Sequence, residues 1–376
     1  MVVDLMLWIL IVISFTFLLM RLIVAGYNYF NAPVLVSNTF KDSDLLSILI
    51  PARNEEGNIG ALLDSILQQQ QVKYEVIVLD DHSTDRTGAI VKDYALRHPE
   101  IKLLQGQLLP EGWTGKNFAC YQLAQEATGK YLLFIDADVI LEDSLVSTAV
   151  GHLKNKSLTL LSLFCQQQTT TFGEKITVPL MNYLLLTLLP LKLIESHADP
   201  IFSAACGQFM LFDGSNYRTN QWHLQVRGQV TEDLAIMRKV KENRNNGEGM
   251  LSGKLMTCRM YGGFYEAVNG FSKNFIAPFN DSIPLFIAFL TVVIAGPIAI
   301  ISTGNLLLIT ALISLVTVTR FFTGRLSGEP IIQIILHPFQ MLSFLCIGIV
   351  SIYHRCAGTG YWKGRKVVKT VFRHNI

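Results

Sequence analysis

Two carboxylates, Asp136 and Asp138, directly follow an apolar run, YLLFI, at residues 131–135. A single small residue separates them, so both can converge on one divalent cation, for which carboxylate oxygens are suitable ligands. Mg²⁺ and Mn²⁺ suit carboxylates and commonly bind together with the diphosphate of a nucleotide. The pair therefore indicates a cation and nucleotide site, and a solvated strand end is the alternative.

Polar clusters also follow two earlier apolar runs. PARNEE at 51–56 comes after LLSILI at 45–50, and DDHSTD at 80–85 begins where YEVIVLD at 74–80 ends. Near-continuous apolar runs of this length fit strands that are buried on both faces of a parallel sheet. Ligands of open α/β sheets bind outside the carboxyl ends of the strands, so we expect the three clusters to line one site.

The elements that must position these clusters alternate along the chain. We expect strands at 45–50, 74–80, 101–104 and 131–136, and helices at 55–70, from the cap Ser83-Thr84-Asp85 to Tyr94, and at 117–127. This alternation predicts an α/β fold with a mostly parallel, Rossmann-like sheet.

Other fingerprints of catalysis are absent from the sequence. It contains no GxxxxGK[ST] loop, no GxGxxG that opens a helix, no HExxH and no GxSxG, which argues against ordinary kinases and dehydrogenases. The six cysteines form no CxxC pair, so we expect buried, reduced thiols. A formal charge of +2 gives no sign of nucleic-acid binding.

Composition indicates a membrane protein, because 50% of the residues are hydrophobic and only 16% are charged. We assign residues 1–26 to a transmembrane anchor, since 5–25 is long and apolar enough to cross a bilayer. The one charged residue of 5–25, Arg21, is expected to snorkel to the interface. Lys and Arg follow the span and none precedes it, which predicts a multi-pass protein of the cell membrane with a cytoplasmic catalytic domain.

Three more apolar segments, at 283–302, 306–319 and 331–353, lead us to assign 283–353 to transmembrane or interfacial helices. The tail 354–376 is basic and has no acid, so we expect it in the cytoplasm. Three spans would place this tail outside. We therefore expect one segment, the short middle one, to be interfacial or re-entrant.

A further apolar segment, 176–194, interrupts the polar region and contains Pro179 and Pro190. A span here would divide the cytoplasmic domain, so we expect an interfacial helix. A buried core helix is the alternative.

Five motifs in order resemble the family 2 glycosyltransferases, which have a GT-A fold. They are PARNEE, DDHSTD, GWTGKN at 112–117, DAD at 136–138 and TED at 231–233. The resemblance covers about residues 45–280 and implies that they form the catalytic domain. More narrowly, 112–139, RMYGGFYEAVNGFSKN at 259–274 and YWKGR at 361–365 resemble the membrane-bound carotenoid glycosyltransferases of bacteria.

The resemblance implies nucleotide contacts at matched positions. Pro51, Arg53 and Glu55 would frame the nucleotide pocket. Asp80 would lie at the uracil side of a UDP-sugar, with Lys116 near the nucleotide. Each has a structural alternative: Glu55 would favour a helix N-terminus, Asp80 would be a turn residue, and Lys116 would be a solvated loop charge.

The resemblance also implies the chemistry. Asp136 would reach the ribose or the metal, Asp138 would be the main ligand of Mg²⁺ or Mn²⁺, and Asp233 would be the general base. The reaction would be inverting transfer of a hexose, with glucose expected, from a UDP-sugar to a carotenoid carboxylate or hydroxyl, as in carotenoid biosynthesis of the staphyloxanthin type. Thr231 is expected to cap the helix that Asp233 begins.

The sequence departs from the family pattern after TED. Many processive members carry QxxRW there, whereas this chain has Arg259-Met260-Tyr261, which argues for a single transfer. Arg259 would pair with the pyrophosphate or form a structural ion pair. The rival hypotheses are a transferase that uses a polyprenyl phosphate or another lipid, and a non-catalytic membrane scaffold with a degenerate GT-A fold.

Overall fold

The computed structural model describes residues 2–38, 40–279, 281–359, 361–362 and 365–366. Its internal contacts divide the chain into two compact units. The sheet unit contains Pro33–Gln166, Lys192–Arg259 and the described residues after 360, and the helical unit contains residues 2–32, Gln167–Leu191 and 260–359. Parts of the expected 45–280 domain, 167–191 and 260–280, are therefore grouped with the apolar helices.

The sheet unit is built on a seven-stranded sheet with the order β3-β2-β1-β4-β8-β6-β9. Its strands are β1 (Asp42–Ala52), β2 (Val72–Asp80), β3 (Ile101–Gln105), β4 (Tyr131–Ile135), β6 (Leu160–Phe164), β8 (Phe209–Asp213) and β9 (Gly247–Leu251). Strand β8 runs antiparallel to both neighbours, and the other pairs are parallel. Every residue of β4 is buried, as expected for a central strand covered on both faces. The predicted α/β class with a mostly parallel sheet is confirmed.

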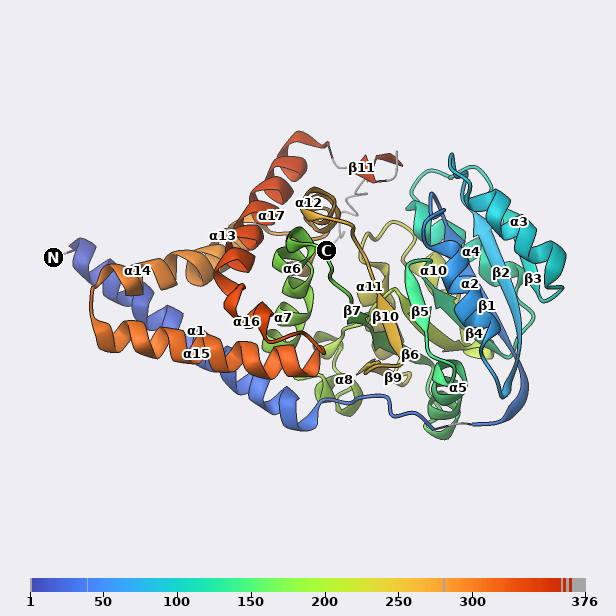
Figure 1. Cartoon of the computed structure of the whole chain (residues 1–376), viewed down its shortest axis with the longest axis horizontal. Coiled ribbons are helices and arrows are strands. Elements are labelled where there is room, and N and C mark those ends of the chain that lie inside the picture. The colour runs from blue at the N-terminus through green and yellow to red at the C-terminus, as the bar shows by residue number, and fades with distance from the viewer. Residues whose placement is uncertain (1, 39, 280, 360, 363–364, 367–376) are drawn as a thin grey trace. The chain divides into compact units, whose positions relative to one another are not determined.

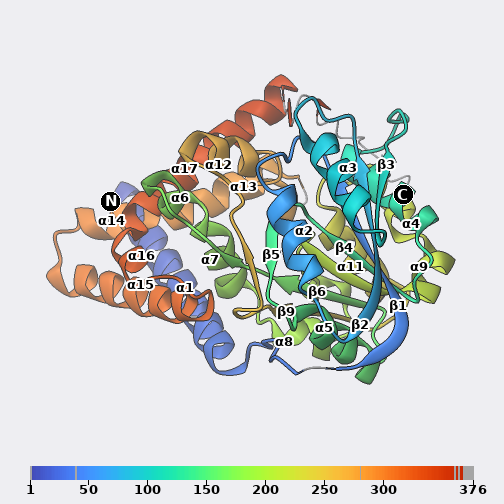
Figure 2. The ribbon, with the colours of Figure 1, turned by 45° about the vertical axis from the view of Figure 1, so that its right-hand side comes forward.

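Helices and short strands complete this unit (Figure 2). The helices are α2 (Ile59–Leu67), α3 (Thr87–Arg97), α4 (Gly115–Glu126), α5 (Leu145–Asn155), α8 (Lys192–Ser196), η1 (Pro200–Phe202), α9 (Gly214–Asn220), α10 (Trp222–Gln225) and α11 (Glu232–Glu242). The short strands are β5 (Val139–Leu141), β7 (Gln166–Gln167), β10 (Met256–Cys258), β11 (Tyr361–Trp362) and β12 (Arg365–Lys366). Strands β5 and β10 pair antiparallel, which places Cys258 opposite Val139.

The strand order places a topological switch between β1 and β4. The chain runs outward from β1 through β2 to β3, and then returns through α4, which packs on β1 and β2, to β4 on the other side of β1. The connections that follow β1 and β4 therefore lead in opposite directions. At such a switch a crevice forms at the carboxyl ends of the strands, where open α/β sheets bind their ligands. Because β8 is antiparallel, its amino end reaches this same edge.

The helical unit gathers the apolar segments (Figure 1). Its helices are α1 (Val2–Asn31), α6 (Phe172–Thr177), α7 (Pro179–Leu188), α12 (Phe264–Ser272), η2 (Ala277–Phe279), α13 (Ile283–Leu290), η3 (Thr291–Ala295), α14 (Gly296–Ser302), α15 (Leu306–Leu326), α16 (Ile332–Ile335) and α17 (His337–Ala357). Among the residues that the structure describes, four stretches are helices long and apolar enough to cross a membrane: Asp4–Asn31, Ile283–Ser302, Leu306–Leu326 and His337–Ala357.

The helix formed by the middle C-terminal segment is longer than its apolar run, 306–319, indicated. Helix α15 does not stop at Thr319 but continues to Leu326 through Arg320, which is buried and paired with Glu329 at 2.8 Å. Helix α16 (Ile332–Ile335) comes next, and α17 begins at His337, with Pro338 in its first turn, where a proline needs no hydrogen-bond partner for its nitrogen. Length therefore no longer singles out one of the three segments, and the expected topology stays a prediction.

Two further expectations concern α1 and α7. Arg21 does not snorkel, because it is buried and donates hydrogen bonds to Thr187 of α7. The 176–194 segment is not one helix, since it contributes to α6, α7 and α8, and α7 packs against α1 and α15. Its proposed interfacial position stays a prediction.

Parts of the C-terminal expectations lie outside the described residues. These are residues 363 and 364 of the YWKGR motif and residues 367–376 of the basic tail. The described remainder of the motif includes the antiparallel pair of β11 and β12.

Candidate functional site

The loops that follow β1 and β2 are tied together by hydrogen bonds. The Arg53 guanidinium donates to the carbonyl oxygens of Asp81 and His82. The Glu55 N–H donates to Thr87 Oγ1 at 2.7 Å, at the start of α3. These contacts hold the PARNEE and DDHSTD clusters at the same edge of the sheet, as the sequence predicted.

Asp80 ends β2 and forms the turn that follows it. Its Oδ1 accepts a hydrogen bond from the Ser83 N–H at 2.9 Å, as the structural alternative requires. Its Oδ2 lies 2.6 Å from the position that a Cβ at Gly88 would take, so a side chain at 88 would displace the carboxylate. Pro51 lies within β1, in register with Leu79. Contacts of both residues with a nucleotide stay predictions.

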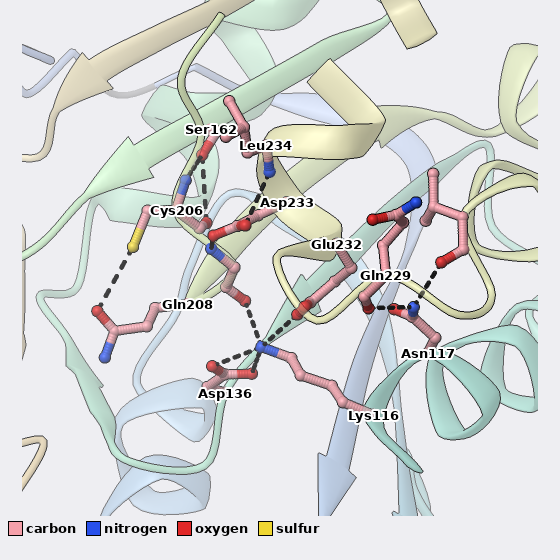
Figure 3. Close-up of polar contacts among 12 residues, drawn as sticks. Lys116, Asn117, Asp136, Ser162, Cys206, Gln208, Gln229, Glu232, Asp233 and Leu234 are labelled. Atoms are coloured by element: carbon pink, nitrogen blue, oxygen red, sulfur yellow. Dashed lines mark hydrogen bonds and ion pairs between the residues drawn. The ribbon is translucent and has the colours of Figure 1, made fainter. Parts of the chain in front are cut away.

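Lys116 lies at the centre of the acidic residues, as Figure 3 shows. Its Nζ is 2.7 Å from Asp136 Oδ1, 3.2 Å from Glu232 Oε1 and 3.3 Å from the Gly207 carbonyl oxygen. Burial alone would lower the pKa of Lys116, but the Asp136 and Glu232 carboxylates hold that pKa well above its usual range. Lys116 is therefore a permanent cation that joins the DAD and TED motifs, and it is not a solvated loop charge.

The GWTGKN motif places this lysine and also fixes the loop before TED. Lys116 lies in the first turn of α4, and the next residue, Asn117, is fully buried. The Asn117 side-chain amide donates to the carbonyl oxygens of Val226, Arg227 and Gln229, at 2.9, 3.3 and 3.1 Å. One short motif thus positions both the cation and the chain that leads into α11.

Helix α11 brings two acids to the site. Asp233 accepts hydrogen bonds from the Gly207 N–H at 3.0 Å and the Leu234 N–H at 2.7 Å, so both of its oxygens are oriented by backbone amides. Burial raises the pKa of Asp233 and raises that of Glu232 to about 7, although Lys116 opposes both shifts. The expected side-chain cap by Thr231 is wrong: this residue occupies the N-cap position but makes no capping hydrogen bond.

Asp138 has the electrostatic environment of a cation ligand. Desolvation, together with the negative charges of Asp136 and Glu55, raises its pKa to about 7, and a cation would relieve this repulsion. Its Oδ1 accepts a long hydrogen bond, 3.4 Å, from the Gln208 side-chain amide. No three His, Cys, Asp or Glu side chains in the described part of the chain are grouped so that they could hold a metal. The site fits Mg²⁺ or Mn²⁺, which commonly use one or two carboxylates plus substrate phosphates.

Sequence reasoning missed Gly207, Gln208 and Glu232 as parts of this site. Glu232 lies inside the TED motif, which was a signal. Gly207 and Gln208 immediately precede β8 and reach the site because Phe209 pairs antiparallel with Ile135 at the end of β4. Nothing in the sequence around Gly207 indicates this pairing. Arg259 follows β10 and is exposed, and both of its expected roles stay open.

The prediction of buried, reduced cysteines is only partly confirmed. Cys120, Cys165 and Cys258 are buried, Cys206 and Cys346 are half-buried, and Cys356 is exposed, so burial is not general. None of the six is in a disulfide. Three of them meet around Gln208: its Oε1 accepts from Cys165 at 2.7 Å and from Cys206 at 3.5 Å, and its Nε2 donates to Cys258 Sγ at 2.7 Å.

Gly207→Ala is expected to weaken donor binding. The added Cβ would lie 3.0 Å from Lys116 Nζ, so the ammonium must shift by a few tenths of an ångström, which disturbs its contacts with Asp136 and Glu232. A weakened charge-assisted contact corresponds to roughly a ten-fold rise in the Kd for the donor. Gly60→Ala in α2 is the matched control, because its Cβ meets only the Tyr94 hydroxyl at 3.8 Å. Equal donor affinity of both variants in calorimetry would show that Gly207 is not part of the site.

Comparisons with known proteins agree with this geometry. The family model "Glycosyl transferase family 2" matches residues 47–215. The chain is 27% identical over 340 residues to a 4,4'-diaponeurosporenoate glycosyltransferase of Staphylococcus aureus (strain MRSA252), covering 85% of this chain and 88% of the relative. It is 26% identical over 264 residues to the Staphylococcus haemolyticus (strain JCSC1435) protein of the same name, covering 67% and 68%.

A solved structure shares the fold. The mannosyltransferase PcManGT from Pyrobaculum calidifontis, in complex with GDP-Man and Mn²⁺, superposes with a TM-score of 0.56 at 17% sequence identity. The match covers 92% of this chain and 99% of that one. The expected GT-A fold is thereby confirmed.

Proposed function

Because the chain is a glycosyltransferase of family 2, we propose that it transfers a hexose, glucose in the first instance, from a UDP-sugar to an apolar carotenoid acceptor with inversion of configuration. Its similarity over 85% of its length to relatives named for diaponeurosporenoate supports a carotenoid carboxylate as the acceptor. The apolar helices support an acceptor that arrives from the bilayer, and the charge distribution around α1 favours a cytoplasmic sheet unit.

One observation carries the proposal: Lys116 joins Asp136, which follows β4, to Glu232 of α11 at the topological switch of the sheet. This arrangement places a cation and two groups of acids at the edge where α/β sheets bind nucleotides. Asp138, beside this centre, has the raised pKa expected of a carboxylate that lacks its counter-ion.

The reaction follows from the roles of these side chains. The acceptor oxygen forms a bond to the anomeric carbon on the face opposite UDP, and the bond from that carbon to the UDP oxygen breaks. With a hydroxyl acceptor, Asp233 takes the hydroxyl proton, and its raised pKa makes it a stronger base than an ordinary aspartate. Asp138 would be the main ligand of the divalent cation, which supplies Lewis-acid stabilisation of the departing diphosphate.

A turnover assay with the purified full chain tests this proposal. UDP-glucose and Mn²⁺ are incubated with a carotenoid acid, with undecaprenyl phosphate or with no acceptor, and the apolar products are separated. We expect glucose in the carotenoid fraction. Transfer to undecaprenyl phosphate alone would establish the polyprenyl alternative, and no UDP release under any condition would favour the non-catalytic scaffold.

A further inference from the structure

The helical unit contains a group of charged and polar side chains that the proposed reaction does not use. We call it the arginine cluster; it consists of Arg21 of α1, Tyr183 and Thr187 of α7, Arg320 of α15, Glu329 in the following loop, and His337 at the start of α17. All of these residues belong to the helical unit.

Two guanidinium groups in the cluster lie on one aromatic ring. The Cζ atoms of Arg21 and Arg320 are 4.3 and 4.8 Å from the centre of the Tyr183 ring. Both arginines are buried, with 2% and 0% of their surface exposed. Arg21 donates from Nε and Nη2 to Thr187 Oγ1, at 3.0 and 2.8 Å. Neutral partners therefore orient Arg21, and they do not balance its charge.

The cluster has more positive than negative charge. Arg320 Nη2 pairs with Glu329 Oε2 at 2.8 Å, so the cluster contains one carboxylate and two guanidinium groups, and arginine does not deprotonate in proteins. Nε and Nη1 of Arg320, Oε1 of Glu329 and Nδ1 of His337 are buried without a hydrogen-bond partner among the described residues. The cluster thus has both an excess positive charge and unused donors.

A buried excess of positive charge costs free energy unless an anion neutralises it. An unpaired charge away from water carries a large desolvation cost, and ionisable residues among membrane-spanning helices commonly mark a ligand site. A guanidinium group offers two parallel donors that match the oxygens of a carboxylate or phosphate. Helices α1 and α15, which carry the two arginines, are both apolar enough to cross a membrane, so a molecule that reaches the cluster from lipid must itself be largely apolar.

We propose that the arginine cluster binds the acidic group, a carboxylate or a phosphate, of an apolar ligand from the bilayer. The ligand is either an anionic phospholipid or an acidic acceptor of the transfer reaction that is held here before its acidic group reacts, a case that rests on the proposed function. The free nitrogens of Arg320 are enclosed by protein, and Glu329 occupies the place of an internal counter-ion. The acidic group of the ligand therefore binds by displacing Glu329 from Arg320.

Because the ligand displaces Glu329 from Arg320, replacing Arg320 and replacing Glu329 are expected to change the affinity for the ligand in opposite directions. Arg320→Gln removes the donors and is expected to weaken binding of an acidic ligand about ten-fold. Glu329→Gln removes the competing carboxylate and is expected to strengthen the same binding. A purely structural ion pair would predict no gain in affinity from Glu329→Gln. Arg325→Gln is the matched control, since Arg325 is an exposed arginine of the same helix.

The experiment uses the full chain in nanodiscs of neutral lipid and a pair of probes that differ in the acidic group. All-trans-retinoic acid and retinol share an apolar chain, and their affinities are measured by quenching of tryptophan fluorescence. We expect the wild type and Arg325→Gln to prefer the acid about ten-fold, Arg320→Gln to lose this preference, and Glu329→Gln to increase it. Arg320→Lys, which keeps the charge but not the paired donors, is expected to keep part of the preference.

Native mass spectrometry with phosphatidylglycerol and phosphatidylcholine distinguishes the two candidate ligands, an acidic acceptor and an anionic phospholipid. Retention of the anionic lipid in the wild type but not in Arg320→Gln, without binding of retinoic acid, identifies a phospholipid site. Equal affinity of the wild type for acid and alcohol, together with equal retention of both lipids, would overturn the proposal. If Arg320→Gln does not fold, Arg21→Gln and Glu329→Gln decide the result. Since none of these measurements requires sugar transfer, failure of the proposed reaction and failure of this site are distinguishable.

Discussion

Replacing Asp138 by alanine is expected to abolish Mn²⁺-dependent binding of UDP-glucose. Asp136 is already paired with Lys116 at 2.7 Å, so Asp138 is the carboxylate that remains for the cation. We expect titration calorimetry to show a Kd at least about 100-fold higher, which corresponds to about 2.7 kcal/mol. Asp143→Ala, an exposed acid that follows β5, is the matched control.

Measurements of thermal stability distinguish a loss of donor binding from misfolding of the Asp138 variants. The folded-state pKa of Asp138, about 7, lies above its ordinary value of 3.8, so the folded protein loses stability as the pH rises through this interval and the carboxyl ionises. Asp138→Asn removes this cost and is expected to raise the Tm of the metal-free protein at neutral pH while donor binding is lost. Unchanged calorimetric binding in Asp138→Ala would refute the metal assignment.

Replacing Asp233 by asparagine is expected to lower kcat by roughly 10²-fold or more with a hydroxylated carotenoid, because the hydroxyl proton then has no base. The loss is expected to be smaller with a carotenoid acid, which is already ionised at neutral pH. Steady-state rates with the two acceptors under matched donor concentrations measure the difference.

Asparagine keeps one oxygen, which can accept the hydrogen bond from the Gly207 or the Leu234 amide but not from both, so Asp233→Asn retains one of these two backbone contacts. An equal loss of rate with both acceptors would argue against the base role and in favour of acceptor positioning by Asp233. Thr231→Ala is a useful comparison, because Thr231 precedes the same helix and makes no capping hydrogen bond.

Much of the sheet unit could be predicted because its signals are local. The expected strand at 131–136 corresponds to β4 (Tyr131–Ile135), and the helix at 117–127 corresponds to α4 (Gly115–Glu126). The acids that follow the predicted strands lie at the expected edge of the sheet, since parallel strands bring their carboxyl ends together.

The parts that were missed depend on contacts between distant residues. Gly207 joins the site through the antiparallel pairing of β8 with β4, which no local pattern specifies. The apolar run that the sequence shows ends at Thr319, whereas α15 continues through Arg320, whose charge is paired with Glu329 inside the helical unit. Arg21 is likewise buried because Thr187 and Tyr183, far away in sequence, provide its contacts.

The most direct test of the central claim is mass spectrometry of apolar pigments from a host that makes a carotenoid acid and expresses this chain. We expect a pigment heavier by one hexose in cells with the wild type, and only the unmodified acid in cells with Asp138→Ala. Absence of the hexosylated pigment with the wild type, when the protein is present in the membrane, or its formation by Asp138→Ala would contradict the account.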